Sequence, residues 1–279
     1  MSDQETNSAS YLLKLFISNT YRSLTARFRC LSNTLIIGAQ RSGTSSLFHY
    51  LKQHPQISTS NIKEVHYYDE QYEKGQLWYQ RHFPYRINRS KIVLEATPYY
   101  LFHPSSAERI LHSAPHAKLI VILRDPVQRA YSHYQMVRKM GIESEPTFER
   151  ALEKEKGRLN GEKEKITGNV HYKSLPHKMM SYLERGKYAD QLASYINLFG
   201  RDNIHIIISE SFYQNPQLIL DTLLEFLQID PFTFELNIIK NMQSYPPLDP
   251  YTKENLEQIF APYNAELENL IGIALPWRK

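Results

Sequence analysis

One segment near the N-terminus constrains the fold more than any other. Residues 34–47 read TLIIGAQRSGTSSL, and the short β-branched run Leu35–Ile37 predicts a buried strand. Gly38 and Gly43 allow a sharp turn and a close approach of the backbone to a ligand. A helix is predicted to begin near Thr44. The free N–H groups at its start face the loop and, with the helix dipole, favour an anion such as phosphate or sulfate.

This loop lacks the lysine of a nucleotide-binding P-loop. Such loops read G-x-x-x-x-G-K-[ST], and their lysine reaches the β- and γ-phosphates of the nucleotide. Here Thr44 directly follows Gly43, and the nearest cation is Arg41, inside the loop. We therefore predict a site for a smaller anion than a magnesium-bound triphosphate.

A second strand and helix start carry another pair of candidate anion ligands. Residues 118–123, KLIVIL, predict a buried strand, and Asp125 followed by Pro126 is typical of an N-cap and a first helical position. Ser132 lies seven residues after Asp125 and returns to the same helix face. Arg124 and Ser132 are therefore predicted to bind one phosphate together.

Strands and helices alternate along most of the chain. Strands are predicted at 34–38, 91–95, 118–123 and 204–208, and helices near 44–54, 105–114, 126–140, 187–199, 215–228 and 252–270. This alternation predicts an α/β fold of the P-loop type, with three layers and a central parallel β-sheet flanked by helices. Both candidate anion sites follow strands, where ligands of such sheets bind.

Composition narrows the functional class. The chain has 279 residues, 42% hydrophobic and 22% charged, and its net charge of +4 does not indicate a nucleic-acid partner. Cys30 is the single cysteine, which excludes an intramolecular disulfide and suits a reducing cytoplasm. Neither a secretory signal nor a run of about 20 apolar residues is evident. We predict a cytoplasmic protein with an N-terminal extension, 1–30, that is partly disordered or amphipathic, and one domain, 31–279.

Residues 11–31 combine apolar side chains with cations. Leu, Phe and Ile alternate there with Lys14, Arg22, Arg27 and Arg29. Two interpretations remain open at this point. One is a basic helix lying on a membrane surface, giving peripheral membrane contact. The other is a helix packed on the body of the domain, or a frayed terminus.

Taken in order, these motifs resemble the PAPS-dependent sulfotransferases, which use 3′-phosphoadenosine 5′-phosphosulfate (PAPS). Residues 40–46, QRSGTSS, resemble the family's 5′-phosphosulfate loop, and 123–132, LRDPVQRAYS, resemble its 3′-phosphate motif. Residues 63–69, KEVHYYD, resemble the acceptor segment of the heparan-sulfate and related carbohydrate sulfotransferases. The end of the chain, 263–277, is similar to bacterial members.

This resemblance implies transfer of a sulfuryl group from PAPS to an acceptor hydroxyl or amine. The product is adenosine 3′,5′-bisphosphate, and no metal is required. The acceptor would be a glycan, a glycolipid or a small hydroxyl compound, with a carbohydrate or glycoconjugate favoured. The sequence does not specify the oligomeric state.

The resemblance also implies roles on the donor side. Arg41 stands where the family carries a lysine, and we predict it as the electrostatic catalyst. The predicted donor ligands are Arg41, Ser42, Gly43, Thr44, Ser45, Ser46, Arg124, Ser132 and Tyr188. Structural alternatives exist: a salt bridge for Arg41, N-capping for Thr44 and Ser45, a strand-end ion pair for Arg124, and core packing for Tyr188.

Glu64 and His66 are the candidate bases. In an extended segment, residues two apart face the same side, so both could point into one cleft. The resemblance puts the base at Glu64, whereas His66 has the more suitable ordinary pKa for taking a proton. We predict Glu64 as the base, supported by His66. Lys63, Tyr67 and Tyr99 are predicted to contact the acceptor.

The chain departs from the family pattern in two places. In residues 95–100, EATPYY, Ala96 stands where the heparan-sulfate enzymes carry a second catalytic lysine. The family's late Lys-Gly-Arg phosphate-binding segment is missing, and residues 240–247 take its place. The polar stretch 160–174 is predicted to be a mobile loop over the acceptor.

Two other functions compete with this one. A P-loop nucleotide kinase predicts a lysine after Gly43 and an acidic Mg²⁺ ligand at a strand end, and the lysine is absent. A non-catalytic protein that binds a nucleotide or a sulfated glycan would be expected to lose its base. Glu64 and His66 are both present.

Overall fold

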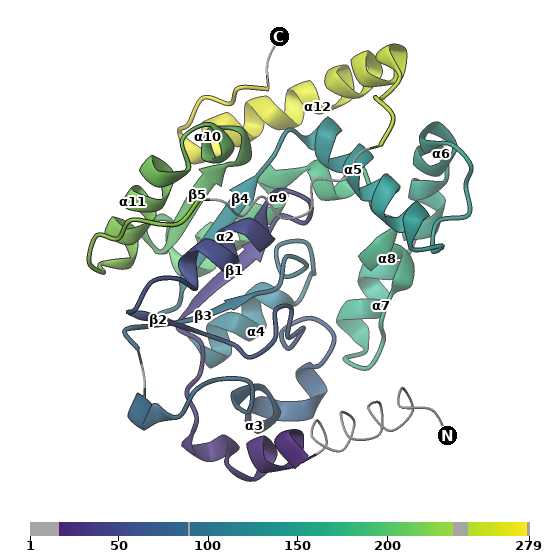
Figure 1. The fold of residues 1–279 in the computed structure, drawn as a ribbon. Helices are drawn as coiled ribbons and strands as arrows, with labels where there is room; N and C mark the ends of the chain where they lie inside the picture. The colour runs from purple at the N-terminus through teal and green to yellow at the C-terminus, as the bar shows by residue number, and fades with distance from the viewer. Residues whose placement is uncertain (1–16, 89, 237–244, 278–279) are drawn as a thin grey trace, which may run out of the picture.

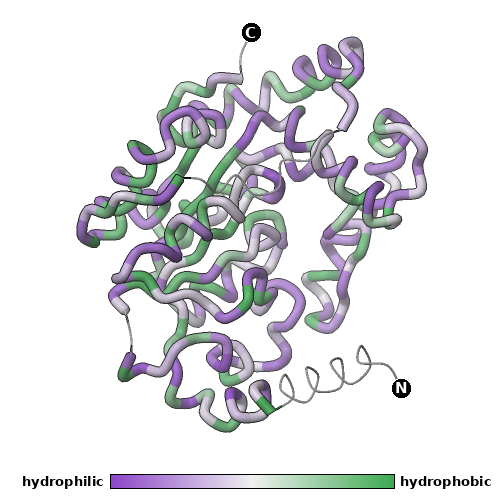
Figure 2. Tube along the Cα trace, viewed as in Figure 1, coloured by the Kyte–Doolittle hydropathy of each residue, from purple (hydrophilic) through white to green (hydrophobic). Residues whose placement is uncertain are grey.

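The computed structural model describes residues 17–88, 90–236 and 245–277 (Figure 1). Its centre is a sheet of five parallel strands in the order β2-β3-β1-β4-β5. The strands are β1 (Thr34–Gly38), β2 (Ile57–Thr59), β3 (Ile92–Ala96), β4 (Lys118–Leu123) and β5 (Ile204–Ile208). They are hydrophobic along most of their length (Figure 2). The four predicted strands are confirmed to within one residue, and the three-residue β2 was missed.

Helices cover both faces of the sheet. They are α2 (Thr44–Leu51), α3 (Gly75–Gln80), α4 (Ser106–Ser113), α5 (Pro126–Lys139), α6 (Phe148–Leu159), α7 (Glu162–Gly168), α8 (Leu175–Met179), α9 (Tyr188–Phe199), α10 (Ser209–Gln214), α11 (Pro216–Leu227) and α12 (Pro250–Ile271). None of the helices within the described ranges is long and apolar enough to cross a membrane.

Alternate strand residues build two hydrophobic layers. Leu35 and Ile37 of β1 pack in one cluster with α4, α9 and α12, whereas Ile36 packs in the other with α2, α10 and α11. Successive side chains of a strand point to opposite faces, which explains this division. A third cluster joins α5, α6, α8 and α12 beside the sheet. The predicted three-layer α/β fold is confirmed.

The sequence misjudged residues 160–174. We predicted a mobile loop, but this stretch contains α7 and is closed by hydrogen bonds around one carboxylate. The Tyr172 hydroxyl donates to Glu162 Oε2 at 2.7 Å, and Ser174 also donates to that oxygen. Lys165 forms an ion pair with Glu162 Oε1 at 2.7 Å. The prediction was wrong because it treated a run of charged residues as unpaired.

Candidate active site

The loop between β1 and α2 reaches the carboxyl edge of the sheet. Gly43 is the N-cap residue of α2 with φ of 110°, a conformation that favours glycine. A Cβ at Gly43 would lie 2.9 Å from Tyr213 Oη and 3.3 Å from Ile122 Cδ1. At Gly38 a Cβ would lie 2.6 Å from Leu101 Cβ. Close packing therefore fixes the path of this loop.

The start of α2 has polar groups that the protein leaves unused. Gly43 supplies no side-chain cap, so the first N–H groups of the helix have no intrahelical acceptor. The Ser46 hydroxyl is buried and has no hydrogen-bond partner within the described residues. Thr44, Ser45 and Ser46 line the same cavity. Such a set of donors fits an anion, because a helix start favours negative charge.

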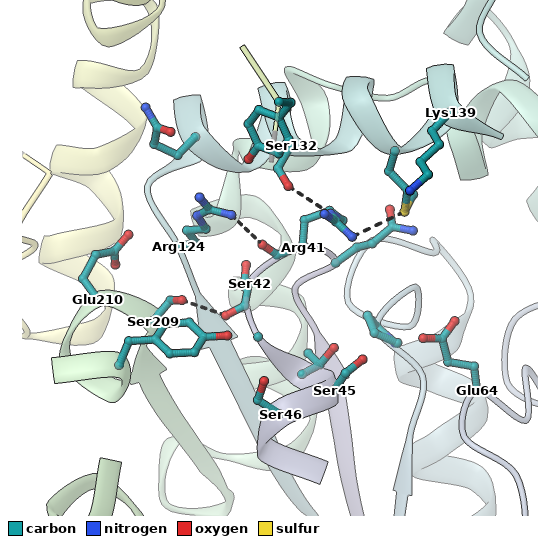
Figure 3. Close-up of a pocket in the computed structure, with 18 of the residues that line it drawn as sticks. Arg41, Ser42, Ser45, Ser46, Glu64, Arg124, Ser132, Lys139, Ser209 and Glu210 are labelled. Carbon is teal, nitrogen blue, oxygen red and sulfur yellow. Dashed lines mark hydrogen bonds between the residues drawn. The ribbon is translucent and has the colours of Figure 1, made fainter. Parts of the chain in front are cut away.

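Arg41 lies across the cavity from this helix start (Figure 3). Its Nε donates to Ser132 Oγ at 3.0 Å, and its Nη1 contacts Met136 Sδ at 3.7 Å. It forms no ion pair with a carboxylate of the residues that the structure describes, which argues against a salt-bridge role. Burial lowers the pKa of Arg41, and the neighbouring Arg124 adds to that effect.

The segment proposed as the second anion site begins a helix where its sequence indicated. Asp125 caps α5, and its Oδ1 accepts from Val127 N at 2.8 Å and Gln128 N at 3.1 Å. Arg124 donates to the Arg41 carbonyl at 3.2 Å. Arg124 and Ser132 line the cavity, together with the β1–α2 loop. The fold therefore joins the two sites, although 90 positions separate Ser42 from Ser132.

Glu210 connects this site to the end of the chain. Its Oε1 accepts from Asp125 N at 3.0 Å, and its Oε2 accepts from Trp277 Nε1 at 3.0 Å. Glu210 lines the cavity beside Ser209, whose hydroxyl donates to the Ser42 carbonyl at 2.8 Å. Sequence reasoning missed both residues, because the motif signals ended at β5.

Tyr188 is not on the cavity surface. It is fully buried, and its hydroxyl donates to the Arg124 carbonyl at 2.9 Å. The structure thus places it behind Arg124, where it fixes the backbone of that residue. This position corresponds to the core alternative, and it corrects the expectation of a direct phosphate contact.

Glu64 and His66 lie close together, but not through an extended backbone. Both residues have positive φ, 62° and 55°, so the alternation argument used for them was wrong. The end of β3 holds this left-handed segment: Glu64 N donates to the Ala96 carbonyl at 2.9 Å, and His66 N to Thr97 Oγ1 at 3.4 Å. Glu64 lines the cavity, with 42% of its side chain exposed.

A chain of polar contacts runs from Lys63 to Asp69. Lys63 Nζ lies 2.5 Å from Glu64 Oε1, and His66 Nε2 lies 3.7 Å from Glu64 Oε2. On its other side, His66 Nδ1 lies 2.7 Å from Asp69 Oδ2. Asp69 belongs to the KEVHYYD segment but was given no role from the sequence. Its spacing of three from His66 was the available signal.

Charge fixes the protonation of this group. Burial favours neutral forms here, but the hydrogen bond with His66 and the charge of Lys63 outweigh it and lower the pKa of Glu64 to about 2. For His66, burial is outweighed by Asp69 and Glu64, which raise its pKa to about 9. At neutral pH, Glu64 is therefore a carboxylate and His66 a cation. Of the two candidate bases, only Glu64 can accept a proton in this state.

The two predicted acceptor tyrosines are buried. Tyr67 stacks on Tyr79 with ring centroids 4.5 Å apart, and 3% of its surface is exposed. Tyr99 bonds His177 Nδ1 through its hydroxyl at 2.8 Å. Neither lines the cavity. Both expectations are corrected: an aromatic residue near a motif indicated burial here, not an accessible ring. Lys63 stays beside the site through Glu64.

The cavity has a volume of about 1160 Å³, somewhat above the ~300–1,000 Å³ usual for ligand pockets. Arg124 and Glu210 lie at one end, Glu64 and Lys139 at the other, and Arg41 between them (Figure 3). Sequence reasoning missed several further lining residues: Gln128, Met136, Lys139, Met140, Tyr213 and Tyr245. The cavity can hold an elongated ligand with separated anionic groups.

Ala96 is fully buried, on the α2 and α11 side of the sheet. The position where the heparan-sulfate enzymes carry a lysine therefore contributes a backbone carbonyl to Glu64 and no cation. Most of the segment 240–247 lies outside the described residues. Within the described ranges, no group of three or more His, Cys, Asp or Glu side chains is arranged to hold a metal ion.

Comparison with known proteins gives a consistent result. The sulfotransferase domain family matches residues 31–255. The chain is 27% identical to the membrane-associated sulfotransferase kil1 of Dictyostelium discoideum, over 93% of this chain and 69% of that protein. It is 26% identical to the mouse (Mus musculus) heparan sulfate glucosamine 3-O-sulfotransferase 5, over 88% and 74%. A crystal structure of a sulfotransferase from Alicyclobacillus acidocaldarius superposes with a TM-score of 0.74 at 30% identity, over 90% and 100%.

Proposed function

This chain belongs to the sulfotransferase domain family and is a sulfotransferase, and on that premise we propose that its donor is PAPS and its acceptor a carbohydrate hydroxyl or amine. One observation supports the proposal: the two candidate anion-binding sites and the Glu64 carboxylate line one cavity. The uncapped start of α2 suits the 5′-phosphosulfate, and Arg124 with Ser132 suits the 3′-phosphate. The relative named for heparan sulfate supports a carbohydrate acceptor.

In the proposed reaction, the acceptor oxygen or nitrogen attacks sulfur, and the bond from sulfur to the 5′-phosphate oxygen breaks. The electron pair goes to that oxygen, which leaves adenosine 3′,5′-bisphosphate. We expect Arg41, which lines the cavity beside the start of α2, to offset the negative charge that grows on this oxygen. Glu64 takes the acceptor proton. A weak base suffices, because the acceptor becomes acidic as its bond to sulfur forms.

His66 and Asp69 would then act as positioning residues. Asp69 keeps His66 charged, and His66 holds the second oxygen of Glu64. This arrangement leaves Glu64 ionised and aimed into the cavity. Sulfuryl transfer resembles phosphoryl transfer in that positioning and charge supply most of the catalysis.

A nucleotide kinase has less support. Thr44 follows Gly43 in place of the P-loop lysine, and the lining carboxylate Glu210 is already engaged by Asp125 N and Trp277 Nε1. A non-catalytic binding protein would not need the ionised Glu64 at the cavity. An assay that shows whether the protein turns PAPS over or only binds it distinguishes a sulfotransferase from a non-catalytic binding protein.

Donor binding is measured by calorimetric titration with adenosine 3′,5′-bisphosphate, beside Mg-ATP. We expect the bisphosphate to bind and Mg-ATP to bind much more weakly. Arg124→Ala removes a charge-assisted contact worth about 1.5–3 kcal/mol, so affinity should fall about 10- to 150-fold. Arg138→Ala, in the last turn of α5 and outside the cavity, is the matched control and should bind normally. A preference for Mg-ATP, or an unchanged Arg124→Ala, would contradict the donor assignment.

The pH profile separates the two candidate bases. With the pKa of Glu64 near 2 and of His66 near 9, kcat/KM should be flat from about pH 4 to about pH 8. It should fall as pH rises through about 9, because His66 then loses the proton with which it holds Glu64. Asp69→Asn should move this fall to lower pH. A rise in kcat/KM through pH 9 would instead make His66 the base.

A further inference from the structure

An apolar stripe faces solvent at the N-terminal end of the described chain. Residues 17–24 are helical and lead into the short helix η1 (Ala26–Phe28). Ile17, Tyr21 and Leu24 follow the spacing 4-3, which puts them on one face of this helix, and Phe28 follows in η1. Their exposed fractions are 57%, 57%, 74% and 54%.

The orientation of this helix is the reverse of the usual one. A surface helix normally turns its apolar face to the core. Here polar groups fasten it to the body: Arg22 donates to the Arg81 carbonyl at 3.2 Å, and Arg81 donates to Ser23 Oγ at 3.4 Å. Tyr85 donates to the Tyr21 hydroxyl at 2.8 Å. The apolar side is therefore left for another surface.

Neighbouring segments extend the stripe. An isolated antiparallel bridge joins Arg29 to Tyr85, which brings the residues before Arg29 beside the helix η3 (Arg86–Asn88). Ile87 of η3 is 92% exposed. In α3, which packs against η1, Leu77 is 58% exposed. Single exposed apolar residues are ordinary, but a contiguous group marks an interaction site. We call these six residues, Ile17, Tyr21, Leu24, Phe28, Leu77 and Ile87, the N-terminal apolar face.

Cations predominate around this face. Arg27, Lys74 and Arg86 are exposed there, and Arg22 and Arg81 are partly exposed. Glu73, beside Lys74, is the single carboxylate within residues 17–30 and 72–88. Residues 17–30 and 74–88 form the end of the molecule around α3 (Figure 1). An anionic partner is therefore favoured there.

We propose that the N-terminal apolar face docks the protein on an anionic lipid bilayer, with the helix 17–24 lying in the interface. A bilayer offers hydrocarbon for the apolar side chains and phosphate or carboxylate head groups for the cations. A second copy of this chain would bring the same cations against one another. A nucleic acid would take the cations but not the leucine and isoleucine. The bilayer suits both parts of the surface.

Sedimentation with vesicles tests the proposal on the full chain. The probes are vesicles of phosphatidylcholine alone and of phosphatidylcholine with phosphatidylserine. We expect binding to the anionic vesicles that weakens with salt. Leu24→Ser should weaken it about tenfold, because the side chain loses its hydrocarbon contacts. Leu218→Ser, on α11 and 61% exposed against 74% for Leu24, is the matched control and should bind as the parent does.

A charge variant completes the design. Arg27→Gln should weaken binding to anionic vesicles about fivefold and leave binding to phosphatidylcholine unchanged. All three positions are exposed, so thermal unfolding should match the parent and show that the variants fold. Three outcomes overturn the proposal: no binding by the parent chain, equal losses in Leu24→Ser and Leu218→Ser, or an oligomer that Leu24→Ser dissociates. None of these depends on the identity of the donor or acceptor.

Discussion

Glu64→Gln is expected to lower turnover by about 10²–10⁴-fold while leaving the affinity for adenosine 3′,5′-bisphosphate unchanged. The substitution keeps the size of the side chain and its contact with Lys63 but removes the group that accepts a proton. Glu64 lies at the opposite end of the cavity from Arg124, so donor binding should not respond (Figure 3). Initial rates with PAPS, beside calorimetry with the bisphosphate, measure the two effects separately.

The matched control for this substitution is Glu70→Gln. Glu70 is six residues further along and pairs with Lys178 at 2.5 Å, but it does not line the cavity. The turnover of Glu70→Gln should differ from that of the parent by no more than a few-fold. If Glu64→Gln retained full turnover, the base would lie elsewhere, and the pH profile would decide whether it is His66.

Arg41→Gln is expected to lower kcat by about 10²–10³-fold, a larger change than in the Kd of the bisphosphate. Glutamine keeps a hydrogen-bond donor for Ser132 but removes the charge that balances the leaving oxygen. Arg41→Lys restores the charge, and we expect it to recover most of the rate. Single-turnover rates with PAPS and calorimetric titration measure the two quantities.

A different outcome would assign Arg41 another task. If Arg41→Gln and Ser132→Ala lowered donor affinity equally and left kcat unchanged, Arg41 would only bind the ground state. If Arg41→Lys were as inactive as Arg41→Gln, the planar fork of arginine would matter more than its charge.

The two segments proposed for the donor, the β1–α2 loop and the start of α5, could be placed from sequence because their determinants are local. Gly43 must be glycine at its positive φ, and Asp125 with Pro126 specifies a helix start within three residues. Each rule acts over a few positions and needs no knowledge of the rest of the fold. The sheet edge then brings Arg124 and the β1–α2 loop together, as expected for strands of a parallel sheet.

For the proposed acceptor residues, the sequence did not predict the backbone conformation or the burial of the side chains. Positive φ at Glu64 and His66 is imposed by the carbonyl of Ala96 and the hydroxyl of Thr97, more than thirty positions away. No local propensity indicates it, since these residues rarely adopt that conformation. Tyr67 was misjudged for a related reason. Whether an aromatic ring is accessible depends on what packs over it, and composition does not contain that information.

The two contacts of Glu210 affect the order in which parts of the cavity can form during synthesis and folding. One carboxylate holds both the backbone of Asp125, beside Arg124, and the indole of Trp277. The ribosome adds Trp277 long after the sheet strands and α5 have emerged. A nascent chain can thus form its glycine-rich loop early, yet the surroundings of Arg124 are complete only after the last helix has docked. If Arg124 binds the 3′-phosphate, as we propose, affinity for that group should report whether Trp277 has taken its place.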